Sequence, residues 1–154
     1  MDTINPMAQL QFSFQVTQTT FHCTDYTVNV QRGIVWVLRQ SIKANHLDAL
    51  AVEMLIQHIE EIIQSDPRIK AFNASAYTVD ALCNEMLALF FAGKNSISRQ
   101  EVEATFNHFA DHLPHYNLLQ QPHKLEMIAY LVFIREIMHH LNLHSITASE
   151  NTNA

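Results

Sequence analysis

The most informative stretch of the sequence is residues 122–143, PHKLEMIAYLVFIREIMHHLNL, whose pattern predicts a helix from about Pro122 to about Leu143. The principal apolar face of this helix carries Met127, Tyr130, Leu131, Ile134, Ile137, Met138 and Leu141. A second apolar stripe, on roughly the opposite side, consists of Leu125, Ile128, Val132 and Leu143. A helix that is apolar nearly all round is either central in its bundle or shared with another chain.

The second stripe predicts self-association. Leaving it in water would forgo roughly 1.5–3 kcal/mol for each aliphatic side chain that burial could cover. Either the N-terminal segment covers the stripe within one chain, or a second chain covers it in a homo-oligomer. In a twofold dimer, Arg135 and Glu136 at the rim of the stripe would pair reciprocally. The predicted interface therefore consists of Leu125, Ile128, Val132, Arg135 and Glu136.

Three further helices are predicted upstream from capping residues and apolar periodicity. Residues 45–64 have an apolar face and a polar face, with an asparagine at the start that can act as a cap. A second pattern spans about residues 78–92 and ends at a glycine. The third occupies residues 98–113, where Ser98 and Glu101 have the spacing of a capping box.

The N-terminal part is predicted to be short and extended. Residues 9–16 alternate between apolar and polar side chains, which is typical of a half-buried strand. Residues 26–43 are ambiguous, because their β-branched side chains favour a strand while the spacing in the second half favours a helix. The predicted fold class is mainly α: a single bundle of about five helices over residues 1–144, with a disordered polar tail over residues 145–154. A central sheet built from residues after Asn45 would contradict it.

Composition excludes several classes of function. The 154 residues carry a net charge of −6 with no basic run, which excludes a typical nucleic-acid or anionic-membrane surface. Two glycines cannot form a Gly-rich phosphate-binding loop or a dinucleotide fingerprint. Cys23 and Cys83 lack the spacing of a thiolate zinc site or a redox pair. The N-terminus does not resemble a signal peptide, and the apolar run 127–134 is too short to span a bilayer, so a cytoplasmic location is expected.

Ten histidines are the compositional anomaly of the chain. Glu101, His108 and His112 fall on one stripe of the predicted helix, because offsets of seven and four residues return to the same face. One carboxylate and two imidazoles could hold zinc or iron with an open position for water. The alternative is a solvated stripe beside the apolar face, and we favour that interpretation.

A second group of histidines lies near the C-terminal end of the last helix. Glu136 and His139 form a Glu-x-x-His element, followed by His140 and His144. Di-metal carboxylate bundles need two such elements, and the sequence contains one. A favourable interaction with the helix dipole is the simpler explanation of these histidines.

The absence of every strong catalytic motif indicates a non-enzymatic interaction or regulatory module, acting through protein contacts and self-associating. The main alternative is a His-rich metal-binding domain or metalloenzyme centred on Glu101, His108 and His112. A helical pocket for a small apolar ligand, lined by phenylalanine and methionine, is a third hypothesis.

Overall fold

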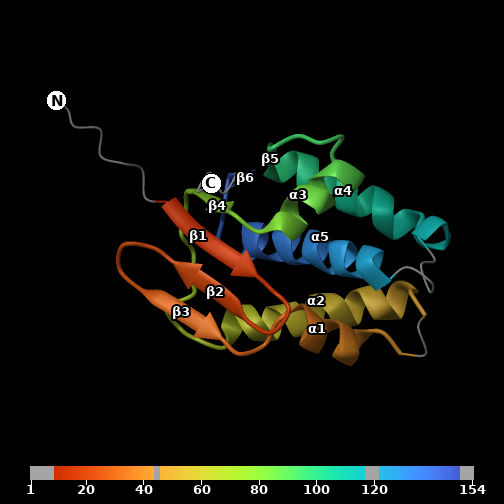
Figure 1. The fold of residues 1–154 in the computed structure, drawn as a ribbon, viewed down its shortest axis with the longest axis horizontal. Helices are drawn as coiled ribbons and strands as arrows, with labels where there is room; N and C mark the ends of the chain where they lie inside the picture. The colour runs from red at the N-terminus through yellow and green to blue at the C-terminus, as the bar shows by residue number, and fades with distance from the viewer. Residues whose placement is uncertain (1–8, 44–45, 117–121, 150–154) are drawn as a thin grey trace.

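A computed structural model describes residues 9–43, 46–116 and 122–149. Within these ranges the chain forms a six-stranded mixed sheet, five α-helices and one short 3-10 helix, η1 (Figure 1). The elements in chain order are β1 (Gln9–Phe14), β2 (Thr19–His22), β3 (Thr27–Val30), α1 (Ile34–Ser41), α2 (Ala49–Gln64), β4 (Ser75–Thr78), α3 (Ala81–Phe90), β5 (Ser96–Ser98), α4 (Arg99–Asp111), η1 (Leu113–Tyr116), α5 (Pro122–His140) and β6 (Ser145–Ala148).

The sheet joins strands that are far apart in the sequence. Its order is β3-β2-β1-β4-β6-β5, in which β1, β2 and β3 form an antiparallel meander. Strands β1, β4 and β6 run parallel to one another, and β5 pairs antiparallel with β6. Parallel neighbours need long crossover connections, and here helices supply them.

The prediction of a mainly α, single helical bundle is therefore wrong: the fold is α/β. Residues 75–78, 96–98 and 145–148, all after Asn45, contribute three strands to the sheet. Strands of three or four residues are too short to show a periodicity, and their pairing partners lie up to about 70 positions away. Ser145–Ala148, predicted as part of a disordered tail, instead forms β6 between β4 and β5.

One face of the sheet is buried by the helices. Phe12 and Phe14 on β1 and Phe21 on β2 are almost fully buried and pack around Phe133 of α5. Gln11 and Ser13, on the opposite face of β1, are only partly covered. This alternation is what a sheet with one covered face requires. The ambiguous region 26–43 contains both predicted elements, first β3 and then α1.

Helix α5 is the centre of the helical layer and contacts each of α1, α2, α3 and α4 (Figure 1). Ile128, Val132 and Leu143 are fully buried within one chain, and Leu125 is partly buried against the core. The second apolar stripe could be covered by the same chain or by a second chain, and at these residues the same chain covers it. Self-association stays a prediction, but the exposed area on which it was based is not present at this stripe. No helix in the described ranges is long and apolar enough to cross a membrane.

Candidate active site

A pocket of about 560 Å³ lies where β1 and β4 end side by side. In open parallel sheets, ligands bind in the crevice beyond the carboxyl ends of the strands, and this volume suits a small molecule. The lining comes from the end of β1 and its turn (14–17), the β4–α3 junction and the first turns of α3 (79–82 and Glu85), Ile34 of α1, and His123 and Glu126 of α5. Four separate segments of the sequence thus build one site.

Asp80 fixes the base of this pocket. It is 6% exposed and follows β4 directly. One of its carboxylate oxygens accepts a hydrogen bond from Ser13 Oγ, and the other accepts from the Phe14 backbone N–H and from Tyr130 Oη, each at 2.7 Å. Because all three donors come from β1 or α5, this buried carboxylate ties both elements to the start of α3. Asp80 is therefore a positioning residue.

Two buried acids beside Asp80 are held in their neutral forms. Burial, and then the negative charge of Asp80, raise the pKa of the Cys83 thiol to about 12. Burial is also the main cause that raises the pKa of Tyr130 well above its ordinary value. The Tyr130 hydroxyl therefore stays protonated and donates its hydrogen bond to Asp80. The Cys83 thiol likewise stays protonated, so it is not a thiolate nucleophile at neutral pH.

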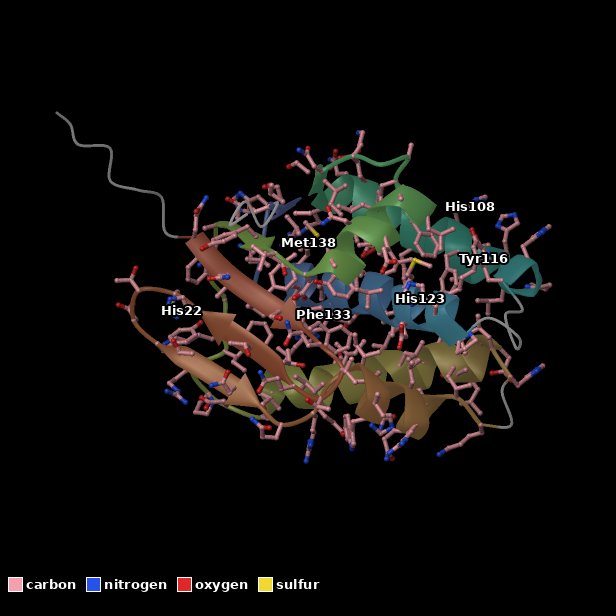
Figure 2. All side chains as sticks on the ribbon, in the orientation of Figure 1. His22, His108, Tyr116, His123, Phe133 and Met138 are labelled. Atoms are coloured by element: carbon pink, nitrogen blue, oxygen red, sulfur yellow. The ribbon has the colours of Figure 1, made fainter. Side chains whose placement is uncertain are left out.

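His123 bridges two carboxylates at the rim of the pocket. Its Nε2 lies 3.0 Å from Glu85 Oε1 on α3, and its Nδ1 lies 2.9 Å from Glu126 Oε1, one turn further along α5. Figure 2 shows His123 near the N-terminal end of α5. The hydrogen bond with Glu85, followed by that with Glu126, raises the pKa of the imidazole. The side chain is about half exposed, so the group can meet a ligand from solvent.

The turn between β1 and β2 closes one side of the pocket. The Ile34 N–H donates to the Gln15 carbonyl at 2.8 Å, and the Val35 N–H donates to the Val16 carbonyl at 3.1 Å. These bonds use the first N–H groups of α1, which would otherwise attract an anion. Gly33 allows the close approach, because a Cβ atom there would lie 2.2 Å from the Gln15 carbonyl oxygen.

The lining determines how the pocket can bind an anion. The turn 15–18 contains no glycine, and the described lining contains no lysine or arginine. A phosphate group therefore cannot be held by a glycine-rich cradle or by a direct contact with a guanidinium or ammonium group. A single carboxylate such as Glu126 could hold a divalent cation, because Mg²⁺ is commonly bound by one or two carboxylates together with phosphate oxygens.

Glu101 has partners of its own, apart from the two histidines that were considered with it as an alternative metal site. Glu101 completes the capping box with Ser98 and pairs with Lys94, and these contacts lower the pKa of its carboxyl group, the Lys94 hydrogen bond most of all. The His108 and His112 rings stack with their centroids 4.2 Å apart, and the Nδ1 of His112 lies 2.8 Å from the His108 carbonyl oxygen. Within the described ranges, these three residues do not form a group able to hold one ion.

The predicted interface residues Arg135 and Glu136 pair with each other within one chain, at 2.8 Å, and their reciprocal pairing in a dimer stays a prediction. The sequence analysis did not identify Asp80, Glu85, His123 or Glu126 as site residues. Asp80 was placed inside a predicted helix, and the contact between Glu85 and His123 joins residues 38 positions apart. Only the His123–Glu126 spacing of three residues was a local indication of their contact.

No protein family's sequence model matches this chain, and no curated protein matches it in sequence. Its fold, however, matches solved structures of enzymes. An Aquifex aeolicus PPX-GPPA enzyme superposes with a TM-score of 0.69 at 9% identity, over 93% of this chain and 53% of that one. An exopolyphosphatase-like protein gives 0.67 at 13% identity, over 95% of this chain and 57% of that one.

The chain thus spans about half the length of these structural neighbours. At such identities the likeness establishes the fold alone. The prediction of a non-enzymatic interaction or regulatory module rested on the absence of strong catalytic motifs and on the two apolar sides of the last helix. It is overturned, because the architecture found here is one that Ppx/GppA enzymes use.

Proposed function

We propose that the chain is a phosphatase-like domain that hydrolyses phosphoanhydride bonds of a small polyphosphate, with the β1–β4 pocket as its substrate site. The observation that carries the proposal is the Glu85–His123–Glu126 group, placed over a pocket at the carboxyl ends of two parallel strands. The likeness of the fold to PPX-GPPA and exopolyphosphatase-like structures supports the same class of reaction.

Glu126 would bind the substrate through a divalent cation, while Glu85 lies on the other side of the His123 ring. A chain of phosphates carries several negative charges, which the described lining cannot neutralise with its own side chains apart from His123. Mg²⁺ or Mn²⁺ bound by the Glu126 carboxylate would neutralise the phosphate oxygens and stabilise the charge that develops on them. Catalysis of phosphoryl transfer depends mainly on such positioning and charge stabilisation.

His123 is suited to the role of general acid. The raised pKa keeps the imidazole protonated toward neutral pH, as a proton donor must be. When water attacks the terminal phosphorus atom, the bond from phosphorus to the bridging oxygen breaks, and that oxygen takes the proton from His123. Two phosphate products leave, and the imidazole regains its proton from solvent.

The test combines binding and turnover of inorganic tripolyphosphate by the full chain. We expect Mg²⁺-dependent binding in calorimetry and Mg²⁺-dependent release of phosphate. Glu126→Gln should weaken the binding, and His123→Gln should lower kcat more than it raises KM. Glu53→Gln and His108→Gln, at exposed positions outside the pocket, are the matched controls and should leave both unchanged. Binding that does not need a divalent cation, or that persists unchanged in Glu126→Gln, would contradict the proposal.

A further inference from the structure

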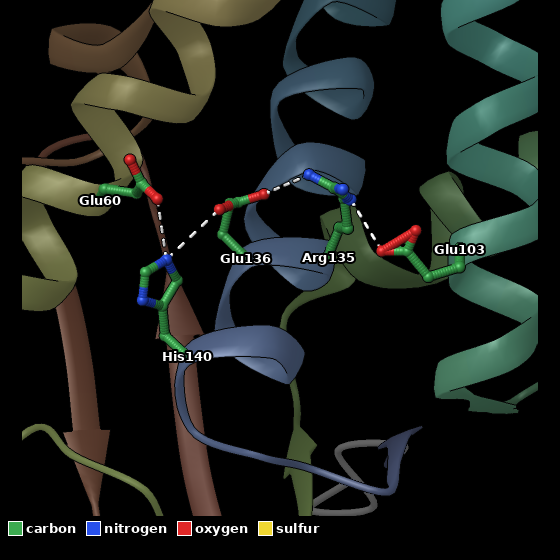
Figure 3. Close-up of polar contacts among 5 residues, drawn as sticks. All are labelled: Glu60, Glu103, Arg135, Glu136 and His140. Carbon is green, nitrogen blue, oxygen red and sulfur yellow. Dashed lines mark hydrogen bonds and ion pairs between the residues drawn. The ribbon is translucent and has the colours of Figure 1, made fainter.

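A second group of polar side chains lies between α2 and α5, at the opposite end of α5 from the pocket (Figure 3). His140 Nε2 lies 2.9 Å from Glu60 Oε2 and 3.5 Å from Glu136 Oε1. Glu136 and His140 are four residues apart on α5 and so share one face, while Glu60 comes from α2. His123 and Glu136 are 13 positions apart, which is about 20 Å along a helix axis. This group is therefore distinct from the proposed active site.

We propose that Glu60, Glu136 and His140 form a binding site for a divalent transition-metal ion such as Zn²⁺. One ligand atom from each of these side chains lies within 4.8 Å of the others, and within the described ranges this is the group of three that meets that condition. For metal–ligand distances near 2.0–2.1 Å, neighbouring ligand atoms in a tetrahedral site are about 3.3 Å apart. The two separations from His140 Nε2 lie on either side of that value.

The burial of Glu136 is the second observation. Its side chain is 3% exposed, and Oε2 accepts a hydrogen bond from Arg135 at 2.8 Å. Among the described residues, the ion-pair contact of Oε1 is the 3.5 Å approach of His140, beyond a good hydrogen-bond length. The Oε1 atom of this nearly buried side chain thus lies close to the other two ligand atoms with only a long ion-pair contact to His140, although burying a carboxylate is costly unless it is paired.

The charges around the group favour a divalent ion. Arg135 bridges Glu136 and Glu103, with its Nε 3.0 Å from Glu103 Oε1, and its guanidinium group lies over the Phe106 ring. The group and its neighbours therefore carry three carboxylates, on Glu60, Glu103 and Glu136, and one guanidinium group. When His140 is neutral, as a metal ligand must be, two negative charges remain, and one divalent ion balances them. Arg135 would orient the Glu136 carboxylate as an outer-shell partner.

The ligand set indicates the class of ion. One imidazole nitrogen with two carboxylate oxygens suits Zn²⁺, and Co²⁺ can report on the geometry of the same site. The side chains of His140 and Glu60 are 24% and 36% exposed, so an ion could enter from solvent and keep a water molecule as its fourth ligand. Metal binding at this site does not depend on the activity proposed for the β1–β4 pocket.

The experiment is a titration of the untagged full chain with Zn²⁺ by calorimetry and with Co²⁺ by visible absorption. We expect one tight site per chain, tetrahedral Co²⁺ bands, and a rise in Tm on adding Zn²⁺. His140→Gln and Glu60→Gln should weaken this site by more than about tenfold, because losing even an outer-shell partner costs about 10–100-fold. Glu60→Gln is included because Glu60 is partly exposed, so this variant is expected to fold.

His139→Gln is the matched control, because His139 is the exposed neighbour of His140 on the same helix. His112→Gln controls for the stacked surface histidines, which could bind Zn²⁺ weakly on their own. Both controls should keep the tight site. If no site tighter than millimolar is found, or if His140→Gln binds Zn²⁺ as wild type does, the group is an ordinary ion pair between α2 and α5 and the proposal is wrong.

Discussion

The hydrogen bond from Tyr130 to Asp80 supplies the sharpest test of how the pocket is held together, through the variant Tyr130→Phe. The hydroxyl is buried and lies 2.7 Å from a buried carboxylate oxygen, so the bond is short and charge-assisted. Hydrogen bonds to charged groups contribute about 1.5–3 kcal/mol each. Removing this donor leaves the carboxylate of Asp80 with Ser13 Oγ and the Phe14 N–H. We expect the free energy of unfolding to fall by about 2 kcal/mol.

Urea unfolding followed by Trp36 fluorescence is the assay, since Trp36 is the single tryptophan and packs on α2 through His58. With an m-value of about 2 kcal/mol/M, the midpoint should fall by about 1 M. Tyr77→Phe is the matched control, because the Tyr77 hydroxyl lies 3.4 Å from a partly exposed Gln11 amide oxygen. It should cost about 0.5 kcal/mol or less. Equal losses in the two variants would refute the central role of the Asp80 contacts.

Four further variants test other parts of the structure. Gly33→Ala should lower the free energy of unfolding by about 3 kcal/mol or more, because its Cβ would overlap the Gln15 carbonyl. Gly93→Ala lies in open space at a φ of +78° and should lower it by about 1–2 kcal/mol. Denaturant melts measure both changes. Val132→Glu should leave the chain unfolded, because a lone carboxylate would enter the core, and circular dichroism would detect the loss of helix. A folded monomer would instead place Val132 at an interface. The pKa of His123 is raised in the folded state, so its protonated imidazole stabilises the fold fully below about pH 6.5. This stabilisation is lost as the pH rises through the pKa of the folded state. The difference in the free energy of unfolding between wild type and His123→Gln should therefore shrink between about pH 6 and about pH 9 in urea melts.

The helices were largely predictable from local sequence because capping and periodicity act over a few residues. Both halves of the capping box at Ser98 and Glu101 are present at the start of α4. The cap of α2 was misplaced by three residues: Asp48 rather than Asn45 is the cap, with its carboxylate accepting from the Ala51 N–H. In each case the interaction that fixes the boundary lies within one turn of it, where sequence reasoning can find it.

The sheet was not predictable because its central strands carry almost no local pattern. Strand β6 consists of Ser-Ile-Thr-Ala inside a polar C-terminal stretch, and β4 consists of Ser-Ala-Tyr-Thr. Each is stabilised by parallel pairing with a strand at least about 60 positions away. Strand β1, with six residues, shows its alternation clearly and was predicted, while β3 was anticipated only as one alternative in an ambiguous region. The same non-local pairing brings together the ends of β1 and β4, so the candidate site was hidden with it.

The central position of helix α5 explains both its two apolar sides and the positions of the two proposed sites. Four helices and the sheet surround α5. The apolar residues on both of its sides are therefore buried within one chain. From 127 to 134 its one polar side-chain atom is the Tyr130 hydroxyl, which needs a buried acceptor and finds Asp80. Titratable side chains are tolerated only towards the two ends of such a helix, where solvent or a counter-charge can reach them. His123 and Glu126 occupy the N-terminal end at the pocket, and Glu136 and His140 occupy the C-terminal end at the proposed metal site.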